Sequence, residues 1–295
     1  MPYTPAARRR YKGKMTDTDR WQKYEHRADD VFVCTPPKSG TTWTTTIVTM
    51  LLHARTDVAS QDLVQWVDAD VVPVDEMVDA LAAQSHRRCL KTHTPFDGIP
   101  WHPGASYIAI YRHPVDMLFS LRKHLANAKN TPPDHPYLAP PDQCLETFVT
   151  RQVDPENIDL DSLSTLVGHY KSYAATPRPD NLLLLHYSDM LADARGAIER
   201  ISDHMGLDRD PTLIDAVHKA SSFDKMKSQA DRYAPFSARG YWRDPKAFFD
   251  SAGTRKWAGD LSKASLNLYQ DQMSRLLSPS GVAWLEDGEA GQARA

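Results

Sequence analysis

The sequence predicts an α/β fold, a single domain with a central parallel sheet flanked by helices. Short apolar stretches alternate along the chain with longer segments whose apolar residues recur at helical spacing, which is the pattern of βαβ units. One of the stretches, Leu182–His186, is apolar almost throughout, as expected for a parallel strand that helices cover on both faces. Ligands of such sheets bind beyond the carboxyl ends of the strands. We therefore look for a functional site in the loops that follow the strands.

The first strand is expected at Val31–Cys34, where four apolar residues stand together. A segment rich in Pro, Gly, Ser and Thr follows over Thr35–Thr42. The segment after it has one apolar face at helical spacing, formed by Trp43, Ile47, Met50 and Leu51. The order strand, tight loop, helix is therefore predicted for residues 31–51.

The same order recurs further along the chain. A short strand is expected at Arg88–Lys91 and a longer one at Ser106–Tyr111. The helix after the longer strand begins at Pro114, where the missing N–H of proline costs no hydrogen bond. The helix after the last strand is predicted to open at Asp189, and its apolar face continues to Met205.

Composition excludes several classes of protein. Lys and Arg total 35 against 38 Asp and Glu, and the formal net charge of −3 argues against a protein that coats nucleic acid. No apolar stretch approaches the roughly 18 residues of a membrane-spanning helix, so no span is expected. The 3 cysteines show neither disulfide nor zinc spacing, and the 12 histidines form no metal-binding motif. We expect a cytoplasmic protein without a metal.

Three parts are distinguished along the chain. Residues 1–30 are predicted to be a polar, loosely held lead-in, residues 31–285 the domain, and residues 286–295 a C-terminal tail. The basic residues near the start indicate a solvated tail or, alternatively, a contact with an anionic partner. Two long segments, the proline-rich 131–141 and the aromatic-rich 228–250, are long enough to be functional covers of a site rather than simple connectors.

The loop after the first strand, Pro36-Pro37-Lys38-Ser39-Gly40-Thr41-Thr42-Trp43, predicts an anion-binding site. Lys38 supplies positive charge, Gly40 permits close approach of the backbone, and the two threonines supply hydroxyl donors. The loop also opens a helix, whose first N–H groups and dipole favour an anion. A Walker nucleotide-triphosphate loop is excluded, because its Lys follows the last Gly whereas Lys38 precedes Gly40.

Two other strand ends carry residues suited to group transfer. Lys91-Thr92-His93 follows the second strand. An imidazole with an ordinary pKa of about 6.5 can take a proton at neutral pH, and Lys91 can neutralise charge on an oxyanion. Arg112 follows the third strand and Ser120 lies two helical turns further on, so that a planar guanidinium and a hydroxyl are available to phosphate oxygens.

These segments resemble the motifs of cytosolic-type sulfotransferases, which use 3′-phosphoadenosine 5′-phosphosulfate (PAPS). The loop at 37–43 resembles the family's 5′-phosphosulfate loop, Lys91–His93 resembles the segment with the catalytic histidine, and Arg112 with Ser120 resembles the pair on the 3′-phosphate. The resemblance implies a P-loop-like sulfotransferase fold, a bacterial member of the family, and PAPS as the donor. The catalytic residues that it implies are Lys38, Lys91, His93 and Ser120.

The resemblance extends to the adenosine end of the donor. Tyr187 matches a tyrosine near the adenosine, and the segment from Ser221 to Met226 resembles one beside the base. Trp43 and Phe223 would enclose the adenine by stacking. The cofactor-binding residues that the resemblance implies are Lys38, Ser39, Gly40, Thr41, Thr42, Trp43, Arg112, Ser120, Tyr187, Ser221, Phe223, Met226, Arg255, Lys256 and Trp257.

Two segments depart from the family pattern. Gly253–Asp260 resembles the C-terminal Arg-Lys-Gly motif on the 3′-phosphate, but Trp257 stands in the place of the glycine. Residues Lys263–Asn267 do not reproduce the dimer motif that members often carry near this point, so both a monomer and a homodimer stay open.

The resemblance predicts transfer of the sulfuryl group of PAPS to a hydroxyl by in-line displacement, with His93 as the base. The aromatic segment suggests a small apolar, aromatic or lipid-linked acceptor such as a glycolipid, although ordinary core filling explains the same residues. The alternative function is that of a kinase-like phosphoryl transferase on a related nucleotide-binding scaffold.

Overall fold

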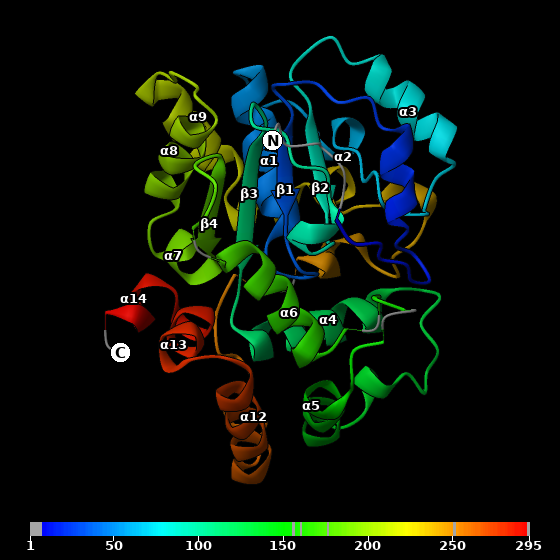
Figure 1. The fold of residues 1–295 in the computed structure, drawn as a ribbon, viewed down its shortest axis with the longest axis vertical. Helices are drawn as coiled ribbons and strands as arrows, with labels where there is room; N and C mark the ends of the chain where they lie inside the picture. Colours follow the sequence, from blue (N-terminus) through cyan, green and yellow to red (C-terminus); the bar gives the residue numbers. More distant parts are fainter. Residues whose placement is uncertain (1–7, 155–156, 160, 176, 250–251, 294–295) are drawn as a thin grey trace.

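The computed structural model describes residues 8–154, 157–159, 161–175, 177–249 and 252–293. Its centre is a four-stranded parallel sheet with the strand order β2-β1-β3-β4 (Figure 1). The strands are β1 (Val31–Cys34), β2 (Cys89–Thr92), β3 (Ser106–Tyr111) and β4 (Leu182–His186). All four strands were expected from the sequence within a residue, and the α/β fold class is confirmed.

Helices cover both faces of the sheet because alternate residues of each strand point to opposite sides. Phe32 and Cys34 of β1 belong to one apolar core, which contains residues of α3, α4, α5, α6, α12 and α13. Val31 and Val33 belong to the other, which contains residues of α1, α8 and α9. Strands β1 and β3 are fully buried between these two layers, as the unbroken apolar runs predict, whereas Lys91 of β2 and Leu183 and Leu184 of β4 are partly exposed.

The helices follow the strands and their loops in chain order. The α-helices are α1 (Thr41–His53), α2 (Ser60–Leu63), α3 (Val74–Ala82), α4 (Pro114–Asn127), α5 (Pro141–Thr150), α6 (Leu163–Ala174), α7 (Tyr187–Ala192), α8 (Ala194–His204), α9 (Pro211–Ala220), α10 (Phe223–Ser228), α11 (Ala230–Tyr233), α12 (Lys263–Leu276), α13 (Pro279–Asp287) and α14 (Glu289–Gln292). The 3-10 helices are η1 (Thr18–Lys23), η2 (Phe96–Gly98), η3 (Pro136–Leu138), η4 (Ser237–Arg239) and η5 (Pro245–Phe248).

The helix predicted from Asp189 to Met205 is in fact two helices, α7 and α8. They meet at Asp193, whose extended backbone (φ −138°, ψ 78°) interrupts the helical path. Its side chain accepts a hydrogen bond of 2.8 Å from the backbone N–H of Gly196 and so caps α8. The apolar period continues across the break because both helices pack on the same side of the sheet.

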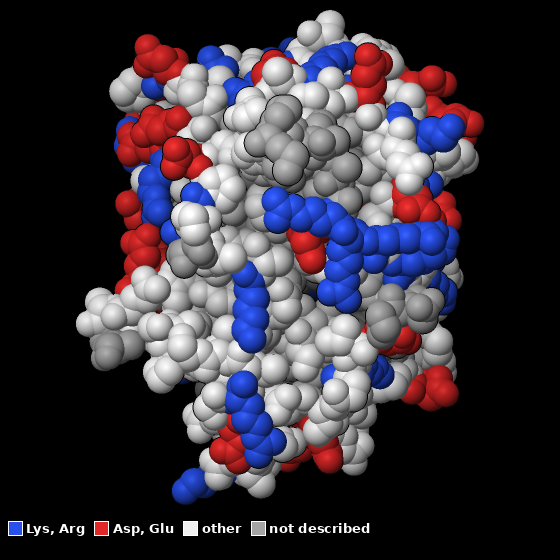
Figure 2. Space-filling model, in the orientation of Figure 1, with Lys and Arg blue, Asp and Glu red and all other residues white. Residues whose placement is uncertain are grey.

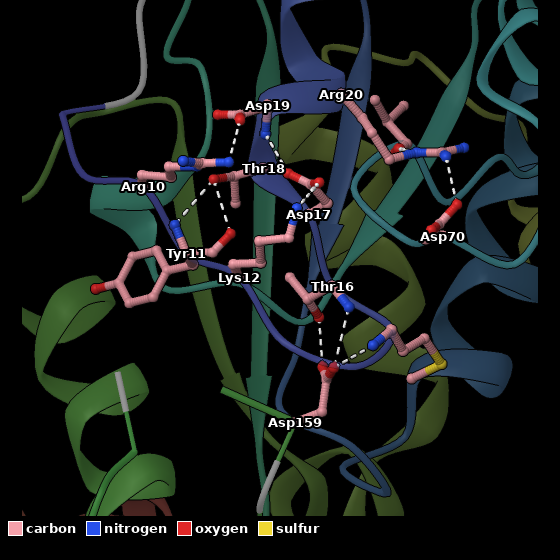
Figure 3. Close-up of polar contacts among 12 residues, drawn as sticks. Arg10, Tyr11, Lys12, Thr16, Asp17, Thr18, Asp19, Arg20, Asp70 and Asp159 are labelled. Carbon is pink, nitrogen blue, oxygen red and sulfur yellow. Dashed lines mark hydrogen bonds and ion pairs between the residues drawn. The ribbon is translucent and has the colours of Figure 1, made fainter. Parts of the chain in front are cut away.

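The lead-in was expected to be loosely held, but residues 8–30 pack on the domain. Its Lys and Arg side chains belong to the face shown in Figure 2, and its polar contacts are drawn in Figure 3. Trp21 of η1 is buried in the core, and Arg20 donates to the backbone oxygen of Val67 at 2.9 Å. Asp30 forms a buried ion pair with Arg88 (2.6 Å). This packing could not be predicted from the polar sequence, because it depends on hydrogen bonds and ion pairs that the carboxylates and arginines of the segment form with one another and with the domain.

Residues 131–141, expected as a cover, do not line the cavity at the strand ends that is described below. Tyr137 of η3 is buried, and its ring contacts Phe148 of α5 (ring centroids 6.5 Å apart). Arg122 of α4 donates to the backbone oxygen of Leu138. The segment therefore joins α4 to α5 and packs against both, and its prolines start η3 and α5.

Candidate active site at the carboxyl ends of the strands

The loops after all four strands open into one cavity of about 810 Å³. Because the strands are parallel, their carboxyl ends lie at one edge of the sheet, where such folds bind ligands. The residues expected from the sequence that line this cavity are Lys38, Gly40, Thr41, Thr42, Trp43, Lys91, His93, Arg112, Ser120, Tyr187, Ser221, Phe223, Met226, Lys256 and Trp257. Ser39 and Arg255 do not line it.

The loop between β1 and α1 has the backbone of an anion-binding turn. Lys38 (φ 61°) and Gly40 (φ 104°) both adopt left-handed conformations, which cost a non-glycine residue energy. At Gly40 a Cβ atom would lie 3.1 Å from the ring of Tyr187, so that both conformation and space favour glycine. Thr41 and Thr35 share a hydrogen bond of 2.5 Å between their hydroxyl oxygens, which joins the helix start to the strand end.

Lys38 is half-buried beside other cationic and aromatic groups. Its pKa falls to about 8, because burial disfavours the ammonium form and Arg112 adds a nearby positive charge. The Nζ atom lies 3.3 Å from Nδ1 of His124 and 4.5 Å from the ring centre of Phe248. An ammonium can only donate, so Nδ1 of His124 accepts. Lys38 is charged at neutral pH and has no carboxylate partner among the described residues.

His93 is held in the tautomer that a general base needs. Its Nδ1 lies 2.5 Å from the backbone oxygen of Thr35, a group that can only accept, so Nδ1 carries the proton and Nε2 has the free lone pair. Burial and the nearby Lys91 lower the pKa of His93 to about 4. The imidazole is therefore neutral at pH 7. Trp66 meets it edge to face, with ring centroids 4.8 Å apart.

Lys91 contacts the same tryptophan through its ammonium group. Its Nζ atom is 4.6 Å from the centre of the Trp66 ring, and burial lowers its pKa to about 8. Trp66 thus contacts both the expected base and the expected oxyanion partner. This position fixes Lys91 without neutralising its charge.

Arg112 offers a free donor to the cavity. One terminal N–H donates to the backbone oxygen of Gly253 at 2.9 Å, and the guanidinium stacks 4.6 Å over the ring of Tyr187. The buried Nε atom has no partner among the described residues. Ser120 faces the same cavity from α4. An anion here would satisfy a donor that is otherwise unpaired.

The aromatic rings expected near an adenine surround one end of the cavity. Trp43 and Tyr187 meet edge to face, with ring centroids 5.7 Å apart. Ser221 ends α9, and Phe223 and Met226 lie on α10. All five line the cavity, so the segments predicted to form a base-binding region do come together.

Arg255 and Ser39 are the expected ligands that do not reach the cavity. The guanidinium of Arg255 forms an ion pair with Asp287 (2.6 Å), and its backbone N–H donates to Asp116 at 2.7 Å. A contact of Arg255 with a 3′-phosphate stays a prediction and requires the side chain to leave Asp287. Ser39 is fully buried, and its hydroxyl has no partner among the described residues.

Comparison with known proteins identifies the family. The family profile described as "Sulfotransferase domain" matches residues 28–281. The chain belongs to the sulfotransferase family. A glycolipid sulfotransferase of Mycobacterium bovis is 26% identical over 310 residues, which is 95% of each chain, and one of Mycobacterium tuberculosis is 26% identical over 309 residues with the same coverage.

Solved structures share the fold of this sulfotransferase. Mouse sulfotransferase SULT7A1, complexed with PAP, matches with a TM-score of 0.69 and 18% identity over 94% of this chain and 92% of that one. Retinol dehydratase, in complex with androsterone and the inactive cofactor PAP, matches with a TM-score of 0.70 and 20% identity over 86% and 82% of the two chains. The P-loop-like sulfotransferase fold expected from the sequence is confirmed.

Residues 235–249 form an aromatic wall of the sulfotransferase cavity. Phe236, Tyr241, Trp242, Phe248 and Phe249 all line it. The wall is tied to α4, because the side chain of Asn127 both accepts from the backbone N–H and donates to the backbone oxygen of Asp244 (3.0 and 2.8 Å). The prediction that this segment covers the site agrees with its position.

Several titratable residues of the cavity were not predicted as site residues from the sequence, among them Asp116, His124 and Asp161. Asp116 and His124 lie on α4, four residues before and after Ser120, so the i, i+4 spacing was a signal that could have revealed them. Burial, Lys38 and His93 together lower the pKa of His124 to about 3, which keeps it a neutral acceptor for Lys38. Asp161 has no such signal. Burial and the neighbouring Asp159 raise its pKa to about 7.

The structure also bears on metals and membranes. Among the described residues, no three His, Cys, Asp or Glu side chains are grouped so as to hold a metal ion. No helix in the described part of the chain is both long and apolar enough to span a bilayer.

Proposed function

We propose that this sulfotransferase moves the sulfuryl group of PAPS to a hydroxyl of an apolar, lipid-linked acceptor, with a glycolipid as the first candidate. The observation that carries the proposal is the meeting of a neutral His93, a charged Lys38 and an unpaired donor of Arg112 in one cavity. These groups correspond to a base, a leaving-group partner and a phosphate ligand.

The cavity residues fit a donor with an anion at each end. Lys38 and the two threonines at the start of α1 would hold the 5′-phosphosulfate, since the N–H groups of a helix start favour an anion and no carboxylate pairs with Lys38 in the part of the chain that the structure describes. Arg112 and Ser120 would hold the 3′-phosphate, which would bind the orphaned Nε. Trp43 and Phe223 would enclose the adenine. The PAP named with the related structures is the product that this reaction would leave.

The residues of the site would divide the reaction between them. Nε2 of His93 takes the proton of the acceptor hydroxyl while the hydroxyl oxygen forms a bond to sulfur. The bond between sulfur and the 5′-phosphate oxygen breaks in line, and Lys38 stabilises the charge that the phosphate gains. Lys91 neutralises charge on the sulfuryl oxygens. Adenosine 3′,5′-bisphosphate and the sulfate ester leave, and the proton stays on His93 until water removes it.

The apolar wall of the cavity supports an apolar acceptor. Phe236, Tyr241 and Trp242 line the same cavity as the charged groups at the strand ends. A volume of about 810 Å³ is near the upper end for small-molecule sites, so it has room for a nucleotide and part of a larger acceptor. The mycobacterial relatives, named glycolipid sulfotransferases, cover 95% of this chain, which favours a glycolipid over a phenol.

We also propose a cytoplasmic location. Cys34, Cys89 and Cys144 are unpaired and buried, and burial raises the pKa of each thiol. Unpaired cysteines are typical of proteins in reducing compartments such as the cytosol.

The test is a sulfate-transfer assay with radiolabelled PAPS and two acceptor sets, glycolipids and simple phenols. We expect labelled glycolipid as the main product. Transfer to phenols with none to glycolipids would overturn the acceptor, and absence of transfer to any hydroxyl would overturn the reaction. ATP with a labelled γ-phosphate, run in parallel, tests the kinase-like alternative.

A further inference from the structure

Five basic residues near the start of the chain are exposed together. Arg8, Arg9, Arg10, Lys12 and Lys14, which we call the N-terminal basic strip, are all solvent-exposed. Figure 2 shows Lys and Arg side chains gathered on the right-hand half of this face, where Figure 1 places the N-terminal segment. A sequence segment with this many basic residues is usually a solvated tail. Whether these residues can form a binding surface therefore depends on whether the fold orders them.

The strip is an ordered part of the fold. The backbone N–H groups of Arg8 and Arg9 both donate to the backbone oxygen of Asp97 at 2.9 Å. The hydroxyl of Tyr11 donates to the carboxylate of Asp97 at 2.8 Å. The hydroxyl of Thr18 accepts from the backbone N–H of Tyr11 at 2.9 Å and donates to its backbone oxygen at 3.1 Å (Figure 3). The backbone that carries these charges is therefore fixed on the surface of the domain.

The carboxylates around the strip neutralise only part of its charge. Arg10 pairs with Asp19 and Lys12 with Asp17, yet their side chains remain 60% and 56% exposed. Arg9 lies 4.9 Å from the ring of Tyr11. Within the part of the chain that the structure describes, Arg9 and Lys14 have no carboxylate within ion-pairing distance.

The strip leads directly to the cavity. Met15 follows Lys14, is 36% exposed, and lines the cavity that contains His93. Its backbone N–H, and that of Thr16, donate to the carboxylate of Asp159 at 2.5 and 3.0 Å. The same carboxylate accepts from the hydroxyl of Thr16 (Figure 3). Asp159 thus fixes an exposed apolar side chain between the basic surface and the acceptor side of the site.

We propose that the N-terminal basic strip docks on an anionic lipid bilayer and presents the cavity mouth at Met15 to a lipid-linked acceptor. The proposal rests on the proposed glycolipid acceptor. A bilayer is favoured as partner because exposed cations are attracted to an anionic lipid surface and because the exposed apolar side chain of Met15 directly follows the strip. A molecule with net charge −3 overall gains such attraction only from a local cluster.

The experiment measures sedimentation with vesicles of phosphatidylcholine alone and of phosphatidylcholine mixed with phosphatidylglycerol. We expect the protein to bind the anionic vesicles and added salt to weaken this binding. Each basic residue near such a surface raises the partition coefficient of the protein onto anionic vesicles by about fivefold. The double variant Arg9→Gln with Lys14→Gln should therefore lower this partition coefficient by roughly 25-fold. The matched control, Lys171→Gln with Lys263→Gln, removes the same charge from exposed positions on α6 and α12 and should bind as the wild type does.

Activity assays separate this proposal from the proposed function. The strip variant should sulfate a detergent-dispersed glycolipid at the wild-type rate and the same glycolipid in anionic vesicles more slowly. Equal vesicle binding by the strip and control variants would overturn the docking surface. Binding of the protein to an RNA homopolymer that prevents its binding to vesicles would overturn it as well. Vesicle binding without any sulfation would instead overturn the proposed function and leave the surface intact.

Discussion

Replacing His93 with Ala tests the proposed base and should lower kcat by about 100- to 1000-fold. With a pKa of about 4, His93 is in its neutral form for roughly 99.9% of molecules at pH 7, so the wild-type rate loses nothing to protonation. General-base catalysis is worth about 10²- to 10⁴-fold. Since burial makes this imidazole a weaker proton acceptor than a free one, we expect the lower part of that range, which corresponds to ~2.7–4.1 kcal/mol of transition-state stabilisation.

The assay for His93 is single-turnover transfer of labelled sulfate, with calorimetry of adenosine 3′,5′-bisphosphate on the same preparations. The affinity for the nucleotide should change by less than about twofold, because Nδ1 of His93 is bound to the backbone oxygen of Thr35 and the proposed role of Nε2 is toward the acceptor hydroxyl. His93→Gln keeps more of the side-chain volume, and His218→Ala is a matched control on the exposed face of α9. A His93→Ala enzyme with near-normal turnover would refute the assignment of the base.

Further predictions concern the charges around the donor. Arg112→Ala should weaken binding of adenosine 3′,5′-bisphosphate by about 10- to 100-fold by calorimetry, because hydrogen bonds to charged groups are lost; unchanged affinity would remove Arg112 from the site. The kcat/KM of the enzyme should fall above about pH 8 as Lys38 loses its proton. In His124→Phe this fall should begin at lower pH, because the ammonium group of Lys38 loses a hydrogen-bond acceptor. A fall of kcat/KM at the same pH in the variant would contradict the contact between Lys38 and His124. The buried His93 and His113 have pKa values lowered to about 4 and about 3, so the unfolded chain binds more protons than the folded one below about pH 6.5. The stability that they contribute is present above that pH and is lost as the pH falls toward 4, so the Tm should fall over this range, and a constant Tm would contradict it.

Much of the site could be predicted because its parts are local in the chain. Lys38 and Gly40 belong to a loop between an adjacent strand and helix, and the conformation of such a loop depends mainly on its own residues. His93 and Arg112 directly follow strands, and parallel pairing brings their ends to one edge whatever lies between them in sequence. The fold class followed from the same alternation of strands and helices.

The rest depends on contacts between distant segments. Asp161 reaches the cavity only because the segment after α5 is bound to Thr16 through Asp159, and no local pattern encodes that contact. Arg255 matched a family motif, yet Asp287 binds its guanidinium in this structure. The packing of the lead-in was missed for the same reason, since the oxygens that bind Arg20 belong to residues about fifty positions away.

The central claim is that this cavity binds one nucleotide by anionic groups at both of its ends. Calorimetric titration with adenosine 3′,5′-bisphosphate beside adenosine 5′-monophosphate tests it most directly, because the two ligands differ only in the 3′-phosphate. We predict tighter binding of the bisphosphate by about tenfold or more, the worth of one charged hydrogen-bonded contact. Equal affinities, or binding of neither nucleotide, would contradict the claim.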